Sequence, residues 1–259
     1  LSTPNRVPQI EVAVGDNATA FVIRHLVPLT VDDDACLADF GRQHDIQIFR
    51  QPGRPDQLVP VWPESPAPLV YRLPDANVEL EFAPADFIQV NAELNQRMVT
   101  RALELLDPQP GESVLDLFCG LGNFTLPLAR RAGRVLGIEA DAMLIEKAQR
   151  NARHNQLPNA EFRLADLYSP ETPDPWGAER FDKWLLDPPR TGAVEVVKRL
   201  PAEGGPHRIL YVSCNPGTLA RDSEVLVHTK GYRLAAAGVM DMFPQTSHVE
   251  AMALFERAN

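Results

Sequence analysis

The chain has 259 residues, of which 25 are lysine or arginine and 35 are aspartate or glutamate, so its formal net charge is −10. Hydrophobic residues make up 44% and charged residues 23% of the sequence, which is typical of globular proteins and excludes a disordered chain. The acidic balance gives no general support for nucleic-acid binding, which usually needs an excess of basic side chains, although a local basic face would escape this count.

The cysteines give a second constraint. Cys36, Cys119 and Cys214 lie far apart, so they form neither a disulfide framework nor a zinc-binding motif. This usage predicts a reducing, cytoplasmic setting and no metal site. No apolar run is long enough for a membrane span and no signal peptide leads the chain, so we expect no membrane partner. Because the first residue is Leu1, we expect a fragment or processed product of a longer protein.

Residues 1–85 have the pattern of a small α+β domain. One helix is predicted near 31–43, with acidic residues in its first turn that suit the helix dipole. Proline-rich segments at 50–57 and 63–68 are predicted loops. The predicted strands are short runs of β-forming residues at 10–14, 19–25, 46–49, 69–73 and 78–82.

Residues 86–259 change to alternating helices and strands. The predicted helices are 92–106, 124–131, 141–155, 193–200 and 217–228. The predicted strands are 114–118, 134–140, 161–165, 181–187, 208–213, 232–239 and 249–256. Such alternation is typical of an α/β fold with a parallel, doubly wound sheet. The last two strands have no helix between them, so we expect an antiparallel edge.

A glycine turn in VLDLFCGLGNFT is the strongest local signal. Gly120 and Gly122 follow a predicted strand, where doubly wound sheets bind ligands, although two glycines can also simply form a tight turn. Asp116 at the strand end needs a binding partner, and Glu139 at the end of the next strand suits ribose hydroxyls. Thr125 stands where a dinucleotide fingerprint needs glycine, which favours S-adenosylmethionine over NAD.

Further polar residues follow the later strands. Asp166 either hydrogen-bonds an adenine amino group or caps a helix. Asp187 in LLDPPRTG is fixed by two prolines at the same sheet edge, where a functional role is favoured over a plain turn. Cys214 precedes a helix that opens with proline, a setting that stabilises thiolates, whereas Cys119 is interpreted as packing. Alternation places the side chain of Glu250 beside that of His248. The apolar run AMALF after Glu250 suits a partly buried general base with a raised pKa, but an exposed strand-end carboxylate is the preferred interpretation.

Five motifs together carry a family resemblance. FIQVNAELNQRMV, DLFCGLGNFTLPLA, LLDPPRTG, YVSCNPGTLARD and DMFPQTSHVEAM occur in the order and spacing of the RNA (uracil-5-)-methyltransferases. The resemblance covers essentially the whole chain, most strongly residues 84–256, and is nearest to members that act on 23S ribosomal RNA. It implies a Rossmann-like, class I S-adenosylmethionine-dependent methyltransferase domain over residues 86–259 and a partial central, RNA-contacting domain over 1–85, in a protein expected to be a monomer.

The resemblance also implies roles for individual residues. Cys214 is implied as the nucleophile that attacks uracil C6, Glu250 as the base that removes the C5 proton, and Asp187 as a further catalytic residue. The implied cofactor-binding residues are Gln89, Phe118, Gly120, Gly122, Asn123, Glu139, Asp166 and Asp187.

The chain also departs from the family pattern. The family's N-terminal RNA-binding barrel and the four-cysteine iron–sulfur site of the ribosomal enzyme have no counterpart here. Cys36 lies in no cluster motif, so we expect no iron–sulfur cluster in this chain. Because the barrel has no counterpart here, we expect weak RNA binding by this chain alone.

Three alternatives remain open. Methylation of an amino group on adenine or guanine usually needs an aromatic residue where Arg190 stands. Cytosine C5 methylation needs a cysteine directly after the proline of that turn. An RNA chaperone that binds the cofactor without turnover is the third.

Overall fold

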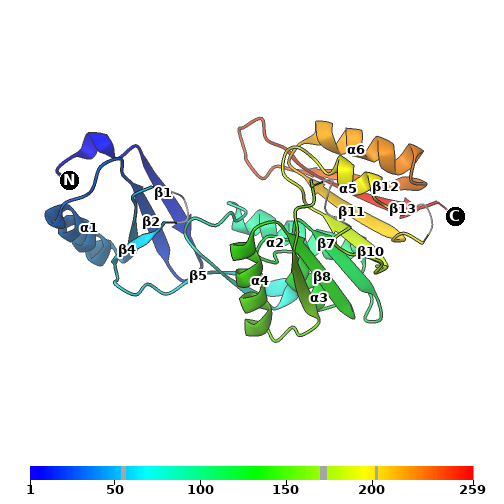
Figure 1. Cartoon of the computed structure of the whole chain (residues 1–259), viewed down its shortest axis with the longest axis horizontal. Coiled ribbons are helices and arrows are strands. Elements are labelled where there is room, and N and C mark those ends of the chain that lie inside the picture. The colour runs from blue at the N-terminus through cyan, green and yellow to red at the C-terminus, as the bar shows by residue number, and fades with distance from the viewer. Residues whose placement is uncertain (54–56, 170–173, 202–203, 259) are drawn as a thin grey trace. The chain divides into compact units, whose positions relative to one another are not determined.

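The computed structural model describes residues 1–53, 57–169, 174–201 and 204–258, which fall into two compact units (Figure 1). The first unit contains Leu1–Arg72 and Glu79–Ile88, and the second contains Leu73–Val78 and Gln89–Asn259. Within the described ranges, no helix has the length and apolar character that crossing a membrane requires.

The first unit is a four-stranded sheet with one long helix. Its elements are η1 (Pro4–Arg6), β1 (Gln9–Val14), β2 (Thr19–Arg24), α1 (Val31–His44), β3 (Ile46–Gln51) and β4 (Val59–Trp62), with strand order β1-β2-β3-β4. Helix α1 begins at a capping box in which the side chains of Thr30 and Asp33 each bond the other's backbone N–H. Leu37 of α1 packs on Ile23 and Ile48 of the sheet and forms this unit's small core.

Strand β4 is the one strand of this unit that periodicity did not predict. It is short, contains Pro60 and pairs with β3 across a register irregularity between Ile48 and Phe49. Proline is tolerated in a strand only at a sheet edge, and β4 lies at one. The two-stranded sheet of β5 (Leu69–Leu73) and β6 (Val78–Phe82), joined by η2 (Pro74–Ala76), matches the predicted strands.

The second unit has the predicted Rossmann-like architecture. Its strand order is β12-β13-β11-β10-β7-β8-β9, and the five strands from β11 to β9 are parallel. The strands are β7 (Ser113–Leu117), β8 (Arg134–Glu139), β9 (Ala160–Leu164), β10 (Lys183–Leu186), β11 (Arg208–Ser213), β12 (Tyr232–Met240) and β13 (Glu250–Arg257). The helices are α2 (Ala92–Leu106), α3 (Thr125–Ala129), α4 (Ala142–His154), α5 (Val194–Lys198) and α6 (Pro216–His228).

The central strands are mostly apolar and buried along their length because both faces of the sheet are covered. All four residues of β10 are buried, and five of the six residues of β11 are buried. Continuous apolar runs of this kind are typical of parallel sheets between helical layers. The ends of these strands, where polar residues begin, therefore mark the positions at which side chains can reach a ligand.

Strand β13 departs from the parallel pattern in a way that matters for the site. The predicted antiparallel edge is confirmed, and β13 lies between β11 and β12 and pairs antiparallel with both. Its first residue, Glu250, therefore lies at the edge where the parallel strands end. Ala251 pairs with Ser213, the last residue of β11, so the next step of the register sets Glu250 opposite Cys214.

Candidate active site

The turn after β7 leaves its backbone open to a ligand. Phe118, Gly120 and Gly122 all have positive φ, at 67°, 53° and 95°. A Cβ added at Gly122 would lie 3.1 Å from Leu126 of α3, so glycine there allows helix and turn to pack. A Cβ added at Gly120 would meet no atom within 4 Å, so the backbone of that residue faces open space.

Glu139 is fixed beside this turn at the end of β8. One carboxylate oxygen accepts the N–H of Gly120 at 3.1 Å, and the other accepts the N–H of Ala140 at 2.7 Å. The second oxygen also accepts the N–H of Asp141 at 3.2 Å, whereas the oxygen that accepts from Gly120 can take a further hydrogen bond. Glu139 is only partly buried, so it retains the capacity to accept from hydroxyl groups of a bound ribose.

Asp116 turns out to be a buried structural residue. Its side chain is fully buried and accepts the hydroxyl proton of Thr125, the first residue of α3. Burial raises the pKa of Asp116 to about 7, and the carboxylates of Asp187 and Glu139 add to this rise. The partner that the sequence demanded for this carboxyl is therefore Thr125, which ties β7 to the helix after the glycine turn.

Asn123 joins the glycine turn to α2. The side-chain amides of Asn123 and Asn95 exchange two hydrogen bonds of 3.0 Å each. Gln89 is half-buried and lies just before the start of α2. The cofactor-binding roles implied for Gln89 and Asn123 stay predictions.

Asp166 and Tyr168 follow β9. Asp166 is exposed, and its carboxylate accepts the N–H of Tyr168 at 2.9 Å within a turn, so it begins no helix among the described residues. The ring centroids of Tyr168 and Phe118 lie 5.6 Å apart. This apolar pair, the open backbone at Gly120 and the carboxylate of Glu139 fit an adenosine-type cofactor, since they offer a wall for a base and acceptors for ribose.

Three reactive side chains meet at the same edge. Asp187 follows β10, and its N–H donates to Leu117 at the end of β7. Cys214 is half-buried directly after β11, and Glu250 at the start of β13 is only 5% exposed. Opposed residues on paired strands bring their Cβ atoms to about 5 Å. The interpretation of Glu250 as an exposed strand-end carboxylate was therefore wrong, because the antiparallel β13 carries this residue into the sheet.

The electrostatics of these groups are coupled. Burial raises the pKa of Asp187 to about 7, with a further rise from Glu250. Burial also raises the pKa of the Cys214 thiol above its ordinary 9.0; Glu250 and Asp187 raise it further and Arg190 lowers it. Burial raises the pKa of Glu250 as well, and Arg190 again opposes the rise. At neutral pH the resting thiol is therefore protonated, and Arg190 is the cation that favours its ionised form.

Arg190 links the segments that carry these groups. Its carbonyl accepts the side-chain amide of Asn215 at 3.2 Å, and a guanidinium nitrogen lies 2.8 Å from Nδ1 of His248. In the sequence, Arg190 is notable only because it stands where amino-group methyltransferases usually have an aromatic residue. Arg190 influences the thiol because the turn after β10 approaches the loop before β13. A local sequence pattern cannot predict this contact.

Asp222 is a second residue that sequence reasoning missed. It lies in α6, is fully buried, and accepts the N–H of Ala193 at 2.6 Å and the hydroxyl of Tyr211 at 2.7 Å. Arg221 bonds the Asp222 carboxylate and the carbonyl of Thr191. These contacts clamp the turn that begins at Asp187 onto α6. An aspartate inside a helix carries no sequence signal of burial, so only the fold reveals this role.

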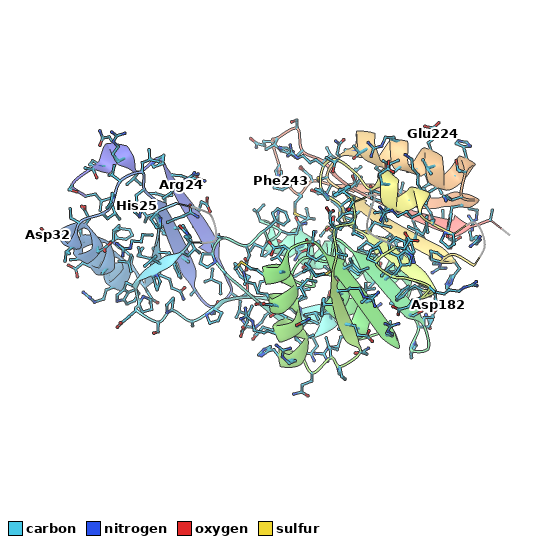
Figure 2. The ribbon with its side chains drawn as sticks, viewed as in Figure 1. Arg24, His25, Asp32, Asp182, Glu224 and Phe243 are labelled. Carbon is cyan, nitrogen blue, oxygen red and sulfur yellow. The ribbon has the colours of Figure 1, made fainter. Side chains whose placement is uncertain are left out.

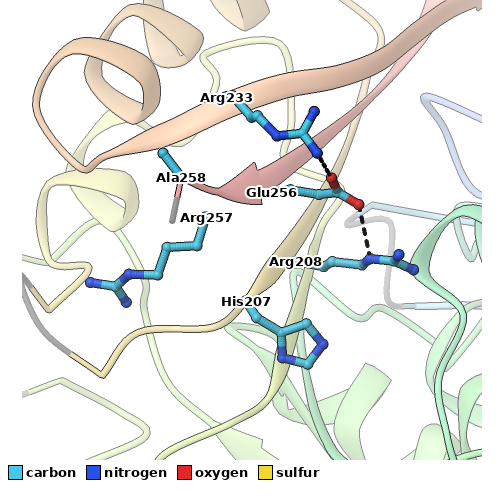
Figure 3. Close-up of a pocket in the computed structure, with 6 residues that line it drawn as sticks. All are labelled: His207, Arg208, Arg233, Glu256, Arg257 and Ala258. Carbon is cyan, nitrogen blue, oxygen red and sulfur yellow. Dashed lines mark hydrogen bonds and ion pairs between the residues drawn. The ribbon is translucent and has the colours of Figure 1, made fainter.

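A pocket at the opposite edge of this sheet does not share the site's chemistry. It has a volume of about 440 Å³ and is lined by His207, Arg208, Arg233, Glu256, Arg257 and Ala258 (Figure 3). The carboxylate of Glu256 is shared by Arg208 and Arg233, its neighbours on the two paired strands. Throughout the ranges that the structure describes, no group of three His, Cys, Asp or Glu side chains is arranged to hold a metal ion.

Comparison with known proteins assigns the family. Residues 70–171 and 177–258 match the family described as tRNA (Uracil-5-)-methyltransferase. The chain belongs to this family. The resemblance of the five motifs is thereby confirmed. Relatives named 23S rRNA (uracil(1939)-C(5))-methyltransferase RlmD are 53% identical over 251 residues in Xanthomonas campestris pv. campestris and 55% identical over 258 residues in Acidithiobacillus ferrooxidans.

The chain spans only part of these proteins. The two alignments cover 97% and 99% of the chain but 56% and 58% of the relatives. The Pyrococcus abyssi tRNA (uracil-54, C5)-methyltransferase, solved in complex with S-adenosyl-L-homocysteine, is 30% identical, has a TM-score of 0.75 and aligns over 94% of this chain and 58% of its own. TYW2 of M. jannaschii, in complex with AdoMet, is 18% identical with a TM-score of 0.58 over 96% of this chain and 100% of its own, which shows a shared fold.

The Asp222 clamp predicts a stability effect. Asp222→Ala should lower the free energy of unfolding by about 2–4 kcal/mol, because it leaves the buried Tyr211 hydroxyl and Ala193 N–H without their acceptor. Urea unfolding followed by circular dichroism measures this. Glu224→Ala, at an exposed residue of the same helix (Figure 2), is the control and should change stability by less than about 0.5 kcal/mol. Equal effects of the two substitutions would refute the clamp.

The raised pKa of Asp116 predicts a pH effect on stability. Its ordinary pKa is 3.8 and its folded pKa about 7, so between these values the folded state holds a proton that the unfolded state has lost. Stability therefore falls as the pH rises from about 4 to 7. In Asp116→Asn, the loss of unfolding free energy between pH 5 and pH 8 should be smaller by about 2–3 kcal/mol.

Urea unfolding at the two pH values tests this. Asp241→Asn, at an exposed position, should leave the pH dependence of the parent chain unchanged. An Asp116→Asn variant that loses as much stability as the parent between pH 5 and pH 8 would show that this carboxyl does not hold a proton in the fold.

Proposed function

We propose that this chain methylates C5 of a uridine in 23S ribosomal RNA with S-adenosylmethionine as the methyl donor. The observation that carries the proposal is the meeting of Cys214, Glu250 and Asp187 at the strand ends beside the glycine turn. Family membership supports uracil C5 as the target. The names of the relatives that are 53–55% identical support 23S ribosomal RNA rather than transfer RNA as the substrate.

The cofactor would lie against the turn after β7. Glu139 would accept the ribose hydroxyls, the backbone at Gly120 would approach the ligand, and Phe118 with Tyr168 would line the base. Gln89, Gly122, Asn123, Asp166 and Asp187 complete the proposed set of cofactor-binding residues. When bound, S-adenosylmethionine supplies a methyl group that is activated by its sulfonium.

Cys214 would begin the reaction by covalent catalysis. Uracil C5 is a weak nucleophile, so a direct transfer of the methyl group is slow. After the thiol loses its proton to solvent, Cys214 bonds to C6 and the electrons of the C5–C6 double bond move onto C5 and the C4 oxygen. One difficult step becomes two easier ones. C5 is then nucleophilic enough to take the methyl group.

Asp187 suits the negative charge that develops on the base. With its pKa raised to about 7, it is substantially protonated at neutral pH and can donate a hydrogen bond to the C4 oxygen of the adduct. Gln89 would help to hold the base. Correct positioning of the reacting groups can contribute about 7–11 kcal/mol to catalysis.

Glu250 would complete the reaction. Its carboxylate removes the proton from C5, the electrons of that C–H bond restore the C5–C6 double bond, and Cys214 leaves as a thiolate. The raised pKa of Glu250 makes it a stronger base than an ordinary carboxylate. Cys214, directly after β11, and Glu250, the first residue of β13, occupy opposed register positions, which suits these roles since one group bonds C6 while the other acts at the adjacent carbon.

The other expectations from the sequence stay predictions. These are a cytoplasmic location, a monomeric state and an iron–sulfur cluster carried only by the additional length of the relatives. Methylation of an amino group on adenine or guanine is disfavoured by the same geometry, because that reaction has no use for a cysteine opposite a buried glutamate.

Substitution of the nucleophile tests the reaction class. Cys214→Ala should abolish tritium release from a 23S RNA transcript labelled with [5-³H]uracil, since this release needs substitution at C5, and should form no covalent adduct with RNA that contains 5-fluorouridine. Cys36→Ser, at the exposed cysteine of the first unit, should release tritium like the parent. No release by the parent chain would reject the function, and release by Cys214→Ala would reject the nucleophile.

Substitution of the base tests the second step. Glu250→Gln should still bond to C6 and transfer the methyl group, but should not remove the C5 proton, so a covalent RNA–protein adduct should accumulate. A gel that denatures protein but preserves the C–S bond, with methyl-labelled cofactor, measures it. Glu256→Gln, on the same strand, is the control and should turn over without accumulating adduct. An inactive Glu250→Gln variant that forms no adduct would contradict the assignment.

A further inference from the structure

We propose that His248 is a positioning residue, which holds the guanidinium of Arg190 beside the reacting thiol of Cys214. The inference rests on the proposed function of Cys214 as a nucleophile and adds a residue to which neither the sequence nor the family match gives a role. Contacts from Asn215 and His248 fix Arg190 from two sides.

The backbone of Arg190 is fixed on the side of the nucleophile. Asn215, which directly follows Cys214, donates its side-chain amide to the carbonyl of Arg190 at 3.2 Å. The side-chain oxygen of Asn215 also accepts the N–H of Gly217 and caps α6, so this residue is itself held by the helix start. The turn that carries Arg190 is therefore anchored next to the thiol.

The side chain of Arg190 is fixed on the side of the base. Its terminal nitrogen lies 2.8 Å from Nδ1 and 3.2 Å from Nε2 of His248, two residues before Glu250. The imidazole in turn packs edge-on against Phe243, with ring centroids 5.6 Å apart and an interplanar angle of 62°. Figure 2 labels Phe243 on the loop that leads into β13. His248 is thus held by its own loop and holds Arg190.

Arg190 needs such an anchor because it is exposed. A long side chain in water is spread over many rotamers, and its charge is screened from any one neighbour. Guanidinium has no acceptor atom, so a contact to imidazole requires a ring nitrogen that carries no proton. In its neutral form His248 gives Arg190 one orientation without a competing negative charge.

The anchored cation acts on both reacting groups. Arg190 lowers the pKa of the Cys214 thiol and of Glu250, against the effect of burial on each. Glu250 and Asp187 have the opposite effect and raise the pKa of the thiol. Loss of the His248 contact should therefore leave the two carboxyls dominant and reduce the fraction of thiolate.

Alkylation of the thiol tests this without RNA or cofactor. The full 259-residue chain is made with Cys36→Ser so that iodoacetamide reports on Cys214, because Cys119 is buried. At pH 7.5, His248→Leu should slow alkylation roughly three- to tenfold, since one pKa unit changes the thiolate fraction tenfold. The midpoint of the rate against pH should rise. His248→Gln, whose oxygen can accept from guanidinium, should keep most of the rate.

A double substitution separates the proposed route from a general disturbance. Arg190→Gln should slow alkylation about as much as His248→Leu, and the double variant should be no slower than either alone, because both remove one interaction. His228→Leu, at an exposed histidine of α6, is the control and should react like the parent. An unchanged rate in His248→Leu, or losses that multiply in the double variant, would overturn the proposal.

Two further readouts keep the result interpretable. Mass spectrometry counts the alkylated cysteines, and a second label on Cys119 would reveal unfolding, in which case His248→Gln and the exposed Arg190→Gln decide. Parent chain that releases no tritium from labelled RNA would reject the proposed function but would leave the alkylation result standing. Failure of the inference and failure of the function are thus separable.

Discussion

The pairing of β13 with β11 is the constraint on which the site depends. Parallel strands all deliver their last residues to one edge, which explains Glu139, Asp187 and Cys214 after β8, β10 and β11. An antiparallel strand delivers its first residue to that edge instead. Because β13 is inserted between β11 and β12, Glu250 enters the site beside the residue that follows β11. A thiol and a buried carboxyl therefore lie at opposed register positions at this edge.

Most elements could be predicted from the sequence because periodicity reports burial. The helix at 92–106 and the strands at 69–73, 78–82 and 208–213 occur at the predicted bounds. Strand β4 escaped prediction because its partner on β3 decides its extended shape, while Pro60 and its neighbours suggest a loop. The sheet edge at which the site lies could be predicted from the sequence, because glycine and acidic residues after apolar runs mark the strand ends.

Individual roles at the site were harder to predict than its location. The burial of Glu250 depends on strand insertion, and the sequence of β13 alone suggested a solvent-exposed end. Asp222 and Arg190 act through partners 29 and 58 residues away, Ala193 and His248. Contacts at such separations leave no periodic trace. The resemblance implies that Glu250 is a base, and its burial at the register position opposite Cys214 supports that proposal.

The fold alone does not determine this chemistry. TYW2 of M. jannaschii shares the fold at 18% identity, so the fold is not confined to this family. What distinguishes a site for pyrimidine C5 is the set of groups placed on that fold. Here these are a thiol after β11, a carboxyl opposite it and a second carboxyl after β10, held by the Asp222 clamp.

Burial and the two carboxyls beside Cys214 make its thiol harder to ionise, and burial raises the pKa values of these carboxyls as well. A thiol beside two carboxyls ionises with difficulty, so the resting site keeps Cys214 protonated and protected from unwanted alkylation or oxidation. The same carboxyls have raised pKa values, which suit one for donating a proton to an enolate oxygen and the other for removing a proton from carbon. The proposed attack by the thiolate would therefore be favoured by a cation close to the thiol. Arg190, fixed by Asn215 and His248, occupies the position from which one charge acts on both the thiol and Glu250.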